Sequence, residues 1–436
     1  MKNLIQIKNL NILALRSLTI LCALAISVGL APRAAAQVNW AQTYYNGAHT
    51  GYNPSEKTLG VGNVSSLKLL WAASVSGGVT NFALDGGVLY ATGQSNNLVA
   101  LNASTGAQLW SINTGGNTGT NAIATGGGLV YVQCELTDKN GDPYGALCAY
   151  KAKTGKSAWQ FSSPCNCLPE AYIQSPLVYA SGVLYFGFAS GGTTSVRGIY
   201  AVKASTGASL WGYEAFSNSF GVGPAAVQGS EVYADAGPSS EIVALATSNG
   251  NVTWTTPIST GNAPVSVSGG VVYASANWTG TNATLYALKA ATGATLWSYT
   301  YGTENWCGSA EAPSPPAVAN GVVYFQGIDG NLYALKAKNG SLLWADMPNA
   351  VGMSCHPFVS SPSIANGVVY INGGDDMGTA SNTTAYNAAT GALLWGSPSQ
   401  HGTLEMPPVV ANGILYFASP GDSICAYSVP AGVEKE

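Results

Sequence analysis

The chain has 436 residues, of which only 8% are charged and 47% are hydrophobic, and its formal net charge is −4. A disordered chain would combine high net charge with few aromatic residues, and a nucleic-acid-binding protein would need a basic surface. The composition excludes both classes. It favours a folded, mostly β protein that is large enough to bury a substantial core.

Residues 1–36 have the pattern of a secretory signal peptide. A basic start precedes an apolar run over residues 18–31, and three alanines at 34–36 supply a cleavage site before Gln37. The apolar run is shorter than the ~20 residues that a membrane span needs. We therefore expect an exported protein, periplasmic or extracellular, without a membrane span, whose single domain covers residues 37–436.

The strongest signal in the chain is an internal repeat that reads A-x-x-x-x-T-G-x-x-x-W and is clearest at residues 287–297. Seven copies of this frame occur, and they end at Trp110, Trp159, Trp211, Trp254, Trp297, Trp344 and Trp395. A small turn, an apolar pair and a tyrosine precede the copies. Eight tyrosines of this kind recur at spacings of 40 to 54 residues: Tyr90, Tyr131, Tyr185, Tyr233, Tyr273, Tyr324, Tyr370 and Tyr416.

Each unit is predicted to contain four short strands. In the sixth unit, turns at Asn320-Gly321, Asp329-Gly330 and Asn339-Gly340 separate four apolar or β-branched runs. Such Asn-Gly and Asp-Gly pairs are typical of tight hairpins, because both central residues need positive φ. Four antiparallel strands repeated eight times predict an all-β protein, an eight-bladed β-propeller of four-stranded antiparallel blades.

The two ends of the chain predict how the ring closes. The eighth unit lacks its tryptophan strand, because the sequence stops at Glu436 where that strand would follow. A spare copy of the missing strand occurs near the start, as Leu-Lys-Leu-Leu-Trp over residues 67–71. We therefore expect the N-terminal strand to complete the last blade.

These repeats resemble the pyrroloquinoline-quinone-type, or quinoprotein alcohol dehydrogenase-like, β-propeller repeat family. The opening segment is similar too, with Trp40, the run Gly51-Tyr-Asn-Pro54 and the pair Asn63-Val64. The eleven-residue frame looks like the family's tryptophan-docking motif, in which each Trp packs against the neighbouring blade. The resemblance implies this docking role for Trp71, Trp110, Trp159, Trp211, Trp254, Trp297, Trp344 and Trp395.

The resemblance implies two functions. The first hypothesis is a monomeric scaffold that binds a protein or a small polar ligand at the channel mouth or the blade edges, with no nucleic acid as partner. The alternative is a dehydrogenase that uses pyrroloquinoline quinone and Ca²⁺ to oxidise an alcohol or sugar, and passes electrons to a separate carrier. No cofactor is assigned, because the chain departs from such enzymes. Cys165 and Cys167 are separated by one residue where the enzymes have adjacent cysteines, and Arg197 is the only arginine after residue 36.

The cysteines are expected to form structural disulfides, because bridges persist in the oxidising compartments that receive exported proteins. Three pairs are candidates: Cys134 with Cys148 across a hairpin, Cys307 with Cys355 between neighbouring loops, and Cys165 with Cys167. Cys425 is left over, aligns with Cys148, and is expected to be a buried thiol. No C-x-x-C pair exists, and no metal site is assigned.

The loops between blades of a propeller converge on one mouth of the central channel. In a chain with so few charges, the residues of these loops are informative. Candidates for a ligand mouth are Tyr172, Trp306, His356 and His401, and candidates for a catalytic carboxylate are Glu170, Glu311 and Glu405. Such Glu and His side chains are donors for Ca²⁺ or a transition metal, and Trp306 would stack on a quinone. Loops also collect polar residues that have no function, so both interpretations stay open.

Overall fold

The structure is a computed structural model of the whole chain. It describes residues 39–115, 123–137, 141, 143–161, 171–173, 175–190, 196–216, 223, 225–236, 241–258, 260, 263–276, 282–302, 315–327, 329–346, 360–374, 381–398, 406–419 and 423–430. The chain divides into two compact units, Met1–Gln37 and Val38–Glu436, and the described residues all belong to the second.

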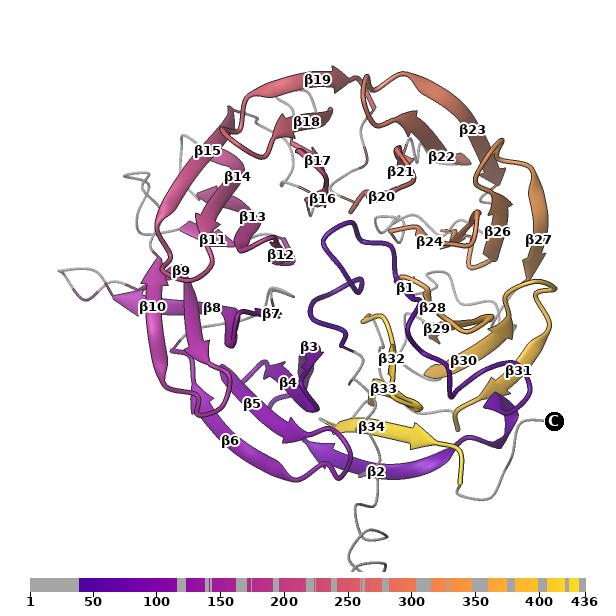
Figure 1. Cartoon of the computed structure of the whole chain (residues 1–436), viewed down its shortest axis with the longest axis horizontal. Coiled ribbons are helices and arrows are strands. Elements are labelled where there is room, and N and C mark those ends of the chain that lie inside the picture. Colours follow the sequence, from indigo (N-terminus) through magenta and orange to yellow (C-terminus); the bar gives the residue numbers. More distant parts are fainter. Residues whose placement is uncertain are drawn as a thin grey trace, which may run out of the picture. The chain divides into compact units, whose positions relative to one another are not determined.

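Eight antiparallel sheets form a ring around a central axis, so the predicted eight-bladed propeller is confirmed (Figure 1). Blades 1 to 4 contain, in chain order, β3 (Val79–Asp85), β4 (Val88–Gly93), β5 (Asn97–Asn102) and β6 (Gln108–Asn113); β7 (Ile123–Gly126), β8 (Leu129–Thr137), β9 (Pro143–Lys151) and β10 (Ser157–Phe161); β12 (Val178–Ala180), β13 (Val183–Ser190), β14 (Val196–Lys203) and β15 (Ser209–Phe216); and β16 (Ala226–Gln228), β17 (Glu231–Asp235), β18 (Ile242–Ala246) and β19 (Val252–Thr256).

Blades 5 to 8 follow the same order. They contain β20 (Ser266–Ser268), β21 (Val271–Ala276), β22 (Asn282–Lys289) and β23 (Thr295–Gly302); β24 (Ala317–Ala319), β25 (Val322–Gln326), β26 (Leu332–Lys336) and β27 (Leu342–Asp346); β28 (Ser363–Ala365), β29 (Val368–Gly374), β30 (Ser381–Asn387) and β31 (Leu393–Gly396); and β32 (Val409–Ala411), β33 (Ile414–Ser419), β34 (Ser423–Ser428) and β2 (Lys68–Ser74). The described residues also include β1 (Tyr52–Asn53), β11 (Ala171–Ile173) and a short 3₁₀ helix, η1 (Val64–Ser66).

The ring closes through the N-terminal strand, as predicted. Strand β2 pairs antiparallel with β34, with Trp71 opposite Ala426. It thereby supplies the outermost strand of the last blade. Two sheets depart from the four-stranded prediction, because β11 adds to β13 in blade 3 and β1 pairs in parallel with β28 in blade 7.

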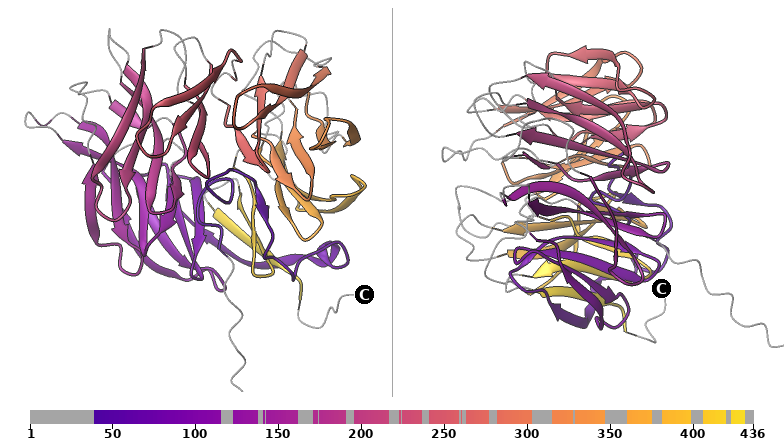
Figure 2. Two further views of the ribbon diagram at one scale, coloured as in Figure 1. Left: turned by 45° about the horizontal axis from the view of Figure 1, so that its top comes forward. Right: turned by 90° about the vertical axis from the view of Figure 1, so that its left-hand side faces the viewer.

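The two ends of the ring differ in their turns. In every blade the first strand turns into the second at one end, which we name the hairpin face. In blades 1 to 7 the third strand turns into the fourth at this end, and in blade 8 β34 ends there and β2 begins there. The second strand turns into the third at the other end, where the fourth strand also leaves for the next blade, and we name this the loop face. Figure 2 shows the strands running across the ring from one face to the other.

The repeated tryptophans lie where one blade meets the next, at the positions that the resemblance implies for docking. Seven of them donate an indole hydrogen bond to a backbone carbonyl in the repeat of the following blade, at 2.7 to 3.1 Å. In three blades the repeated tyrosine donates to the same carbonyl as the tryptophan; for example, Tyr324 and Trp344 both donate to Ala388. The motif Gly of the next blade lies against the indole. At Gly340, where φ is +70°, a Cβ would lie 2.5 Å from Trp297 Cε3.

Two of the cysteine predictions can be assessed on the described residues. Cys134 and Cys148 form a disulfide between β8 and β9, with Cα atoms 5.8 Å apart. They are a diagonal pair rather than a directly opposed one, because Cys134 lies opposite Ala146 in the register. Cys425 is a buried free thiol on β34, as expected, and burial raises its pKa.

Candidate functional site

The predicted ligand mouth falls almost wholly outside the described residues. This applies to Glu170, Glu311, Glu405, Trp306, His356 and His401, and equally to Cys165, Cys167, Cys307 and Cys355. Tyr172 belongs to β11, where it is paired with Ala189 of β13, and only its backbone is described. The strands that lead into these loops, such as β23 and β27, end on the loop face. The grouping of the loop side chains therefore remains a prediction.

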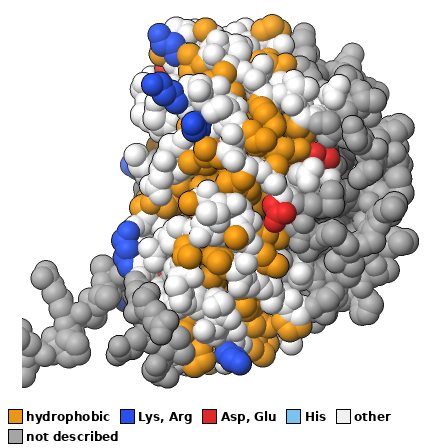
Figure 3. All heavy atoms as spheres, turned by 90° about the vertical axis from the view of Figure 1, so that its right-hand side faces the viewer, with side chains coloured by type: hydrophobic (Ala, Val, Ile, Leu, Met, Phe, Trp, Pro, Cys, Tyr) orange, Lys and Arg blue, Asp and Glu red, His pale blue; other side chains and the backbone are white. Residues whose placement is uncertain are grey.

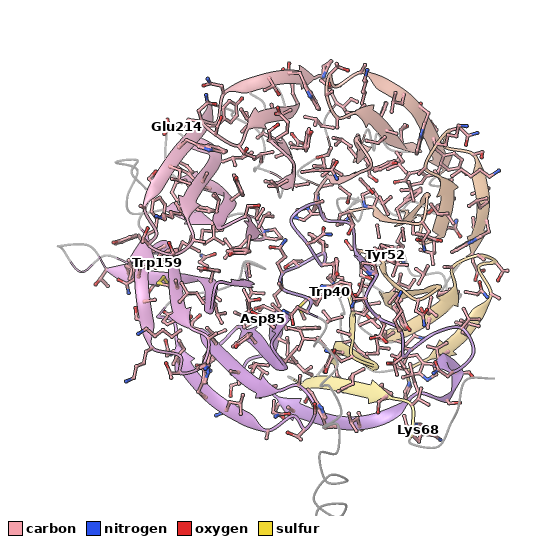
Figure 4. All side chains as sticks on the ribbon, in the orientation of Figure 1. Trp40, Tyr52, Lys68, Asp85, Trp159 and Glu214 are labelled. Carbon is pink, nitrogen blue, oxygen red and sulfur yellow. A yellow bond between two sulfur atoms is a disulfide. The ribbon has the colours of Figure 1, made fainter. Side chains whose placement is uncertain are left out.

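The centre of the ring contains a feature that the sequence analysis missed. Residues 39–53, which we name the channel segment, run around the inside of the ring and bond to the innermost strand of every blade. Figure 4 shows Trp40 and Tyr52 of this segment inside the ring, whereas Trp159 lies on its outer strands. The contacts follow blade order from 1 to 8: Trp40 with Leu84, Ala41 with Thr125, Gln42 with Tyr179, Gly47 with Val227, Ala48 with Val267, Thr50 with Val318, Gly51 with Ile364, and Asn53 with Val410.

These contacts satisfy backbone groups that the inner strands would otherwise leave without a partner. An inner strand has a neighbour on its outer side only, so its inward N–H groups need another acceptor, and a buried unpaired N–H is costly. In blades 6 and 7, Val318 N donates to Thr50 O at 2.8 Å and Ile364 N to Gly51 O at 2.7 Å. In blade 3 the acceptor is a side chain, Oε1 of Gln42, at 2.6 Å from Tyr179 N. The segment therefore ties the blades together from within.

The path of the channel segment requires an unusual backbone. Three of its larger residues have positive φ, namely Tyr44 at +62°, Tyr45 at +78° and His49 at +53°. Non-glycine residues adopt this region rarely, and each such residue costs of order 1–2 kcal/mol. Gly51 has φ +58°, and a Cβ there would lie 2.7 Å from Pro362 O and 2.8 Å from Ala317 Cβ. Strain of this kind persists only where the surrounding contacts over-determine the conformation.

His49 is the buried titratable group of the channel segment, with 1% of its surface exposed. Its Nδ1 lies 3.1 Å from Val265 O, so Nδ1 carries the proton and donates. Its Nε2 has no hydrogen-bond partner among the described residues. The ring meets Tyr44 edge-on, with centroids 5.0 Å apart. Burial lowers the pKa of His49 from 6.5 to about 4, with the Val265 carbonyl opposing this shift. The imidazole is therefore neutral at pH 7.

A buried carboxylate anchors the chain where it leaves the channel. Glu56 is 1% exposed, and its Oε1 accepts hydrogen bonds from Thr58 N at 2.6 Å and Leu59 N at 3.0 Å. Its Oε2 accepts from Gly413 N at 2.9 Å, in the first turn of blade 8. Three backbone N–H groups compensate the cost of burying this charge. Glu56 therefore fixes the chain that follows the channel segment to the first turn of blade 8, on the hairpin face.

The described residues show no set of three or more His, Cys, Asp or Glu side chains that could hold a metal ion. Nor does the described part of the chain contain a helix of the length and apolar character needed to cross a membrane. The residues predicted to hold a quinone and Ca²⁺ lie outside this part of the chain.

A family model described as outer membrane protein assembly factor BamB, the PQQ_2 family, matches residues 58–299 and 197–376 of the chain. The chain belongs to this family. This match confirms the resemblance that the sequence analysis drew from the eleven-residue frame. No curated protein sequence matches the chain.

Solved structures of PQQ_2-like propellers have the same fold at low sequence identity. Quinohemoprotein alcohol dehydrogenase from Comamonas testosteroni superposes with a TM-score of 0.70 and 15% identity, over 91% of this chain and 81% of that one. A europium-containing methanol dehydrogenase gives 0.66 and 14%, over 90% of each chain. BamB from Moraxella catarrhalis gives 0.56 and 18%, over 83% of this chain and 99% of that one. These likenesses establish the fold alone.

Proposed function

We propose that this PQQ_2 propeller is an exported, periplasmic or extracellular scaffold that holds a partner protein against the outer strands of its blades. The proposed export depends on residues 1–36 acting as a signal peptide. The family description as an assembly factor supports the scaffold role. One observation of the structure carries it, namely the exposure of large apolar side chains on the outer strands.

These side chains recur at the one or two positions before the docking tryptophan. They are Leu69 and Leu70 on β2, Leu109 on β6, Leu210 on β15, Val252 on β19, Leu296 on β23, Leu342 and Leu343 on β27, and Leu393 on β31, and each is 42% to 60% exposed. Figure 3 shows hydrophobic side chains across this outer surface. Soluble proteins rarely expose large contiguous apolar patches except at interaction sites.

The outer strands also present backbone groups that could pair with a partner. Each is the last strand of its sheet, so one of its edges has no neighbouring strand within the sheet. An edge strand can accept an extended segment of another protein, with backbone hydrogen bonds giving affinity and side-chain contacts giving specificity. Apolar side chains beside such an edge would provide that specificity in a chain with few charges.

The scaffold proposal predicts site-specific cross-linking. A photoreactive amino acid at Leu296 or Leu343, on the outer strands of blades 5 and 6, should give a discrete adduct with a partner in the exporting cell. Replacing the neighbouring Leu342 by Lys should reduce the Leu343 adduct about tenfold, as expected for loss of one interface anchor. Val61 is 42% exposed but lies off the outer strands, and it provides the control position. Equal adducts from Val61 and the outer strands would count against the proposal.

A second candidate function is the quinone-dependent dehydrogenase. It is supported by the fold shared with the alcohol and methanol dehydrogenases over about nine-tenths of the chain. In this hypothesis Glu170, Glu311 or Glu405 would act as the base, and Trp306 would stack on the quinone. When bound, the quinone would supply the electron-accepting chemistry.

A calorimetric titration with pyrroloquinoline quinone separates the two candidates. The dehydrogenase hypothesis predicts stoichiometric binding that needs Ca²⁺ and disappears with a chelator, because the cation would neutralise the cofactor carboxylates in a chain with one arginine after residue 36. The scaffold hypothesis predicts no heat of binding with or without Ca²⁺. Titration of a Glu311→Gln variant would then show whether any binding observed involves the predicted mouth.

A further inference from the structure

The charged residues of the described chain are segregated between the two faces of the ring. Nine lysines lie on the hairpin face, in hairpins, at strand ends or, for Lys57, beside the Glu56 anchor, and all nine are exposed: Lys57, Lys68, Lys151, Lys153, Lys156, Lys203, Lys289, Lys336 and Lys338. Their regular placement has a local cause. Four of them are the last residue of the third strand, three positions before the Thr or Asn of the Thr-Gly or Asn-Gly turn of the repeat.

The acidic residues have the opposite distribution. Six carboxylates lie toward the loop face, at strand ends or in the turns there: Glu135, Glu214, Asp235, Glu241, Asp329 and Asp346. Among the described residues, the one cationic residue placed toward that face is Arg197, the second residue of β14. The hairpin face has three carboxylates, and neutral donors already bond to them. Asn39 donates to Asp85, Thr253 donates to Glu231, and Glu56 is buried under three backbone N–H groups.

Figure 3 shows this polarity from the side of the ring, with lysines toward one edge and carboxylates nearer the other. The formal charge of the described hairpin face is therefore +6, from nine lysines and three carboxylates, against −5 for the loop face, from six carboxylates and Arg197. The chain as a whole is acidic, with a net charge of −4. A uniformly acidic surface would repel an anionic partner. A surface whose positive charge is gathered on one face attracts such a partner to that face and directs the acidic face away from it.

The geometry of the lysines indicates the shape of the partner. They belong to blades 2, 3, 5, 6 and 8 and to the segment after the channel, so they surround the face instead of converging on one point. A small anion could contact only one or two of them. A nucleic acid is best held by a basic groove with aromatic stacking platforms. A flat, extended anionic surface could approach all nine together.

We propose that the hairpin face docks the protein onto an anionic lipid membrane surface, with the channel axis normal to the membrane and the acidic loop face pointing away. Each lysine near such a surface adds to binding, and the attraction is confined to about a Debye length. Only side chains on the face itself therefore contribute. This docking is independent of the proposed scaffold function, and it leaves the outer strands and the loop face free for other contacts.

Co-sedimentation with lipid vesicles tests the proposal, with the protein that remains after removal of residues 1–36. The protein should bind vesicles that contain phosphatidylglycerol and should not bind vesicles of phosphatidylcholine alone, and high salt should release it. The double variant Lys203→Gln with Lys289→Gln should lower the partition coefficient about 30-fold. These lysines are exposed and end β14 and β22, so the variant is expected to keep its fold, which circular dichroism checks.

A matched control changes the net charge equally at the other face. Asn113→Asp with Gln160→Glu also removes two units of positive net charge, at exposed positions on β6 and β10 toward the loop face. It should change vesicle binding less than threefold, because these positions lie about a ring's thickness from the lysines. The same loss in both variants would show that net charge alone is responsible, and would overturn the oriented docking. Stronger binding to duplex DNA than to the anionic vesicles at equal salt would also overturn it.

Discussion

A Gly51→Ala variant should lose about 3 kcal/mol more unfolding free energy than a Gly86→Ala variant. The two glycines have nearly the same backbone, with φ +58° and +56°, so the cost of a side chain at positive φ is common to both. They differ in their surroundings. A Cβ at Gly86 would meet nothing within 4 Å, whereas at Gly51 it would meet Pro362 O and Ala317 Cβ below 3 Å.

The contacts at Gly51 cannot relax through a side-chain rotation, because one is a backbone oxygen and the other a Cβ. The channel segment would have to move away from blades 6 and 7. That movement would break the hydrogen bonds from Val318 N and Ile364 N to the segment, and each buried N–H left unpaired costs about 1–3 kcal/mol. The difference should appear as a lower urea midpoint at unchanged m-value, followed by tryptophan fluorescence. Equal midpoints for the two variants would mean that the segment contributes little to the stability of the ring.

The blades could be predicted from the sequence because their information is local. In blade 6 the turns at Asn320-Gly321, Asp329-Gly330 and Asn339-Gly340 separate β24 to β27 where the sequence analysis separated them. These turns depend on residues that tolerate positive φ, and the spacing of the docking tryptophans repeats the same unit around the ring. The closure by residues 67–71 followed from counting repeats. Local chemistry and a regular period were sufficient for the fold.

The channel segment could not be predicted in this way. It has no periodicity, and its bonds join backbone groups that are far apart in the sequence, such as Gly51 with Ile364. The positive φ of Tyr44 and His49 also contradicts their intrinsic preferences, because tertiary contacts impose it. Only Trp40 and the run from Gly51 to Pro54 gave a signal, through the resemblance to the repeat family. The loop residues of the predicted mouth have neither strand periodicity nor a repeat frame in their local sequence, and their grouping stays a prediction because they lie outside the described residues.

The same segment makes stability depend on pH through His49. Its pKa is lowered from 6.5 to about 4 by burial, so between these values the unfolded chain binds a proton that the folded chain does not. Stability should therefore decrease as the pH falls from about 6.5 to about 4, by about 3 kcal/mol in total, and this contribution should level off below pH 4. Above pH 6.5 both states are neutral at this residue, and its contribution is constant.

The carboxylates also titrate in this range, so a matched comparison is needed to isolate His49. The chain has three histidines, and in a His356→Gln, His401→Gln background His49 is the only one left. Adding His49→Gln to that background should reduce the loss of unfolding free energy between pH 7 and pH 4 by about 3 kcal/mol. The carboxylate contributions are the same in both proteins and cancel.

If the two pH profiles ran parallel, His49 would have to gain its proton in the folded ring as readily as in the unfolded chain. Its Nε2, which has no hydrogen-bond partner among the described residues, would then have to be open to water. The channel segment would in that case be a loosely held strand instead of the internal tie between the eight blades.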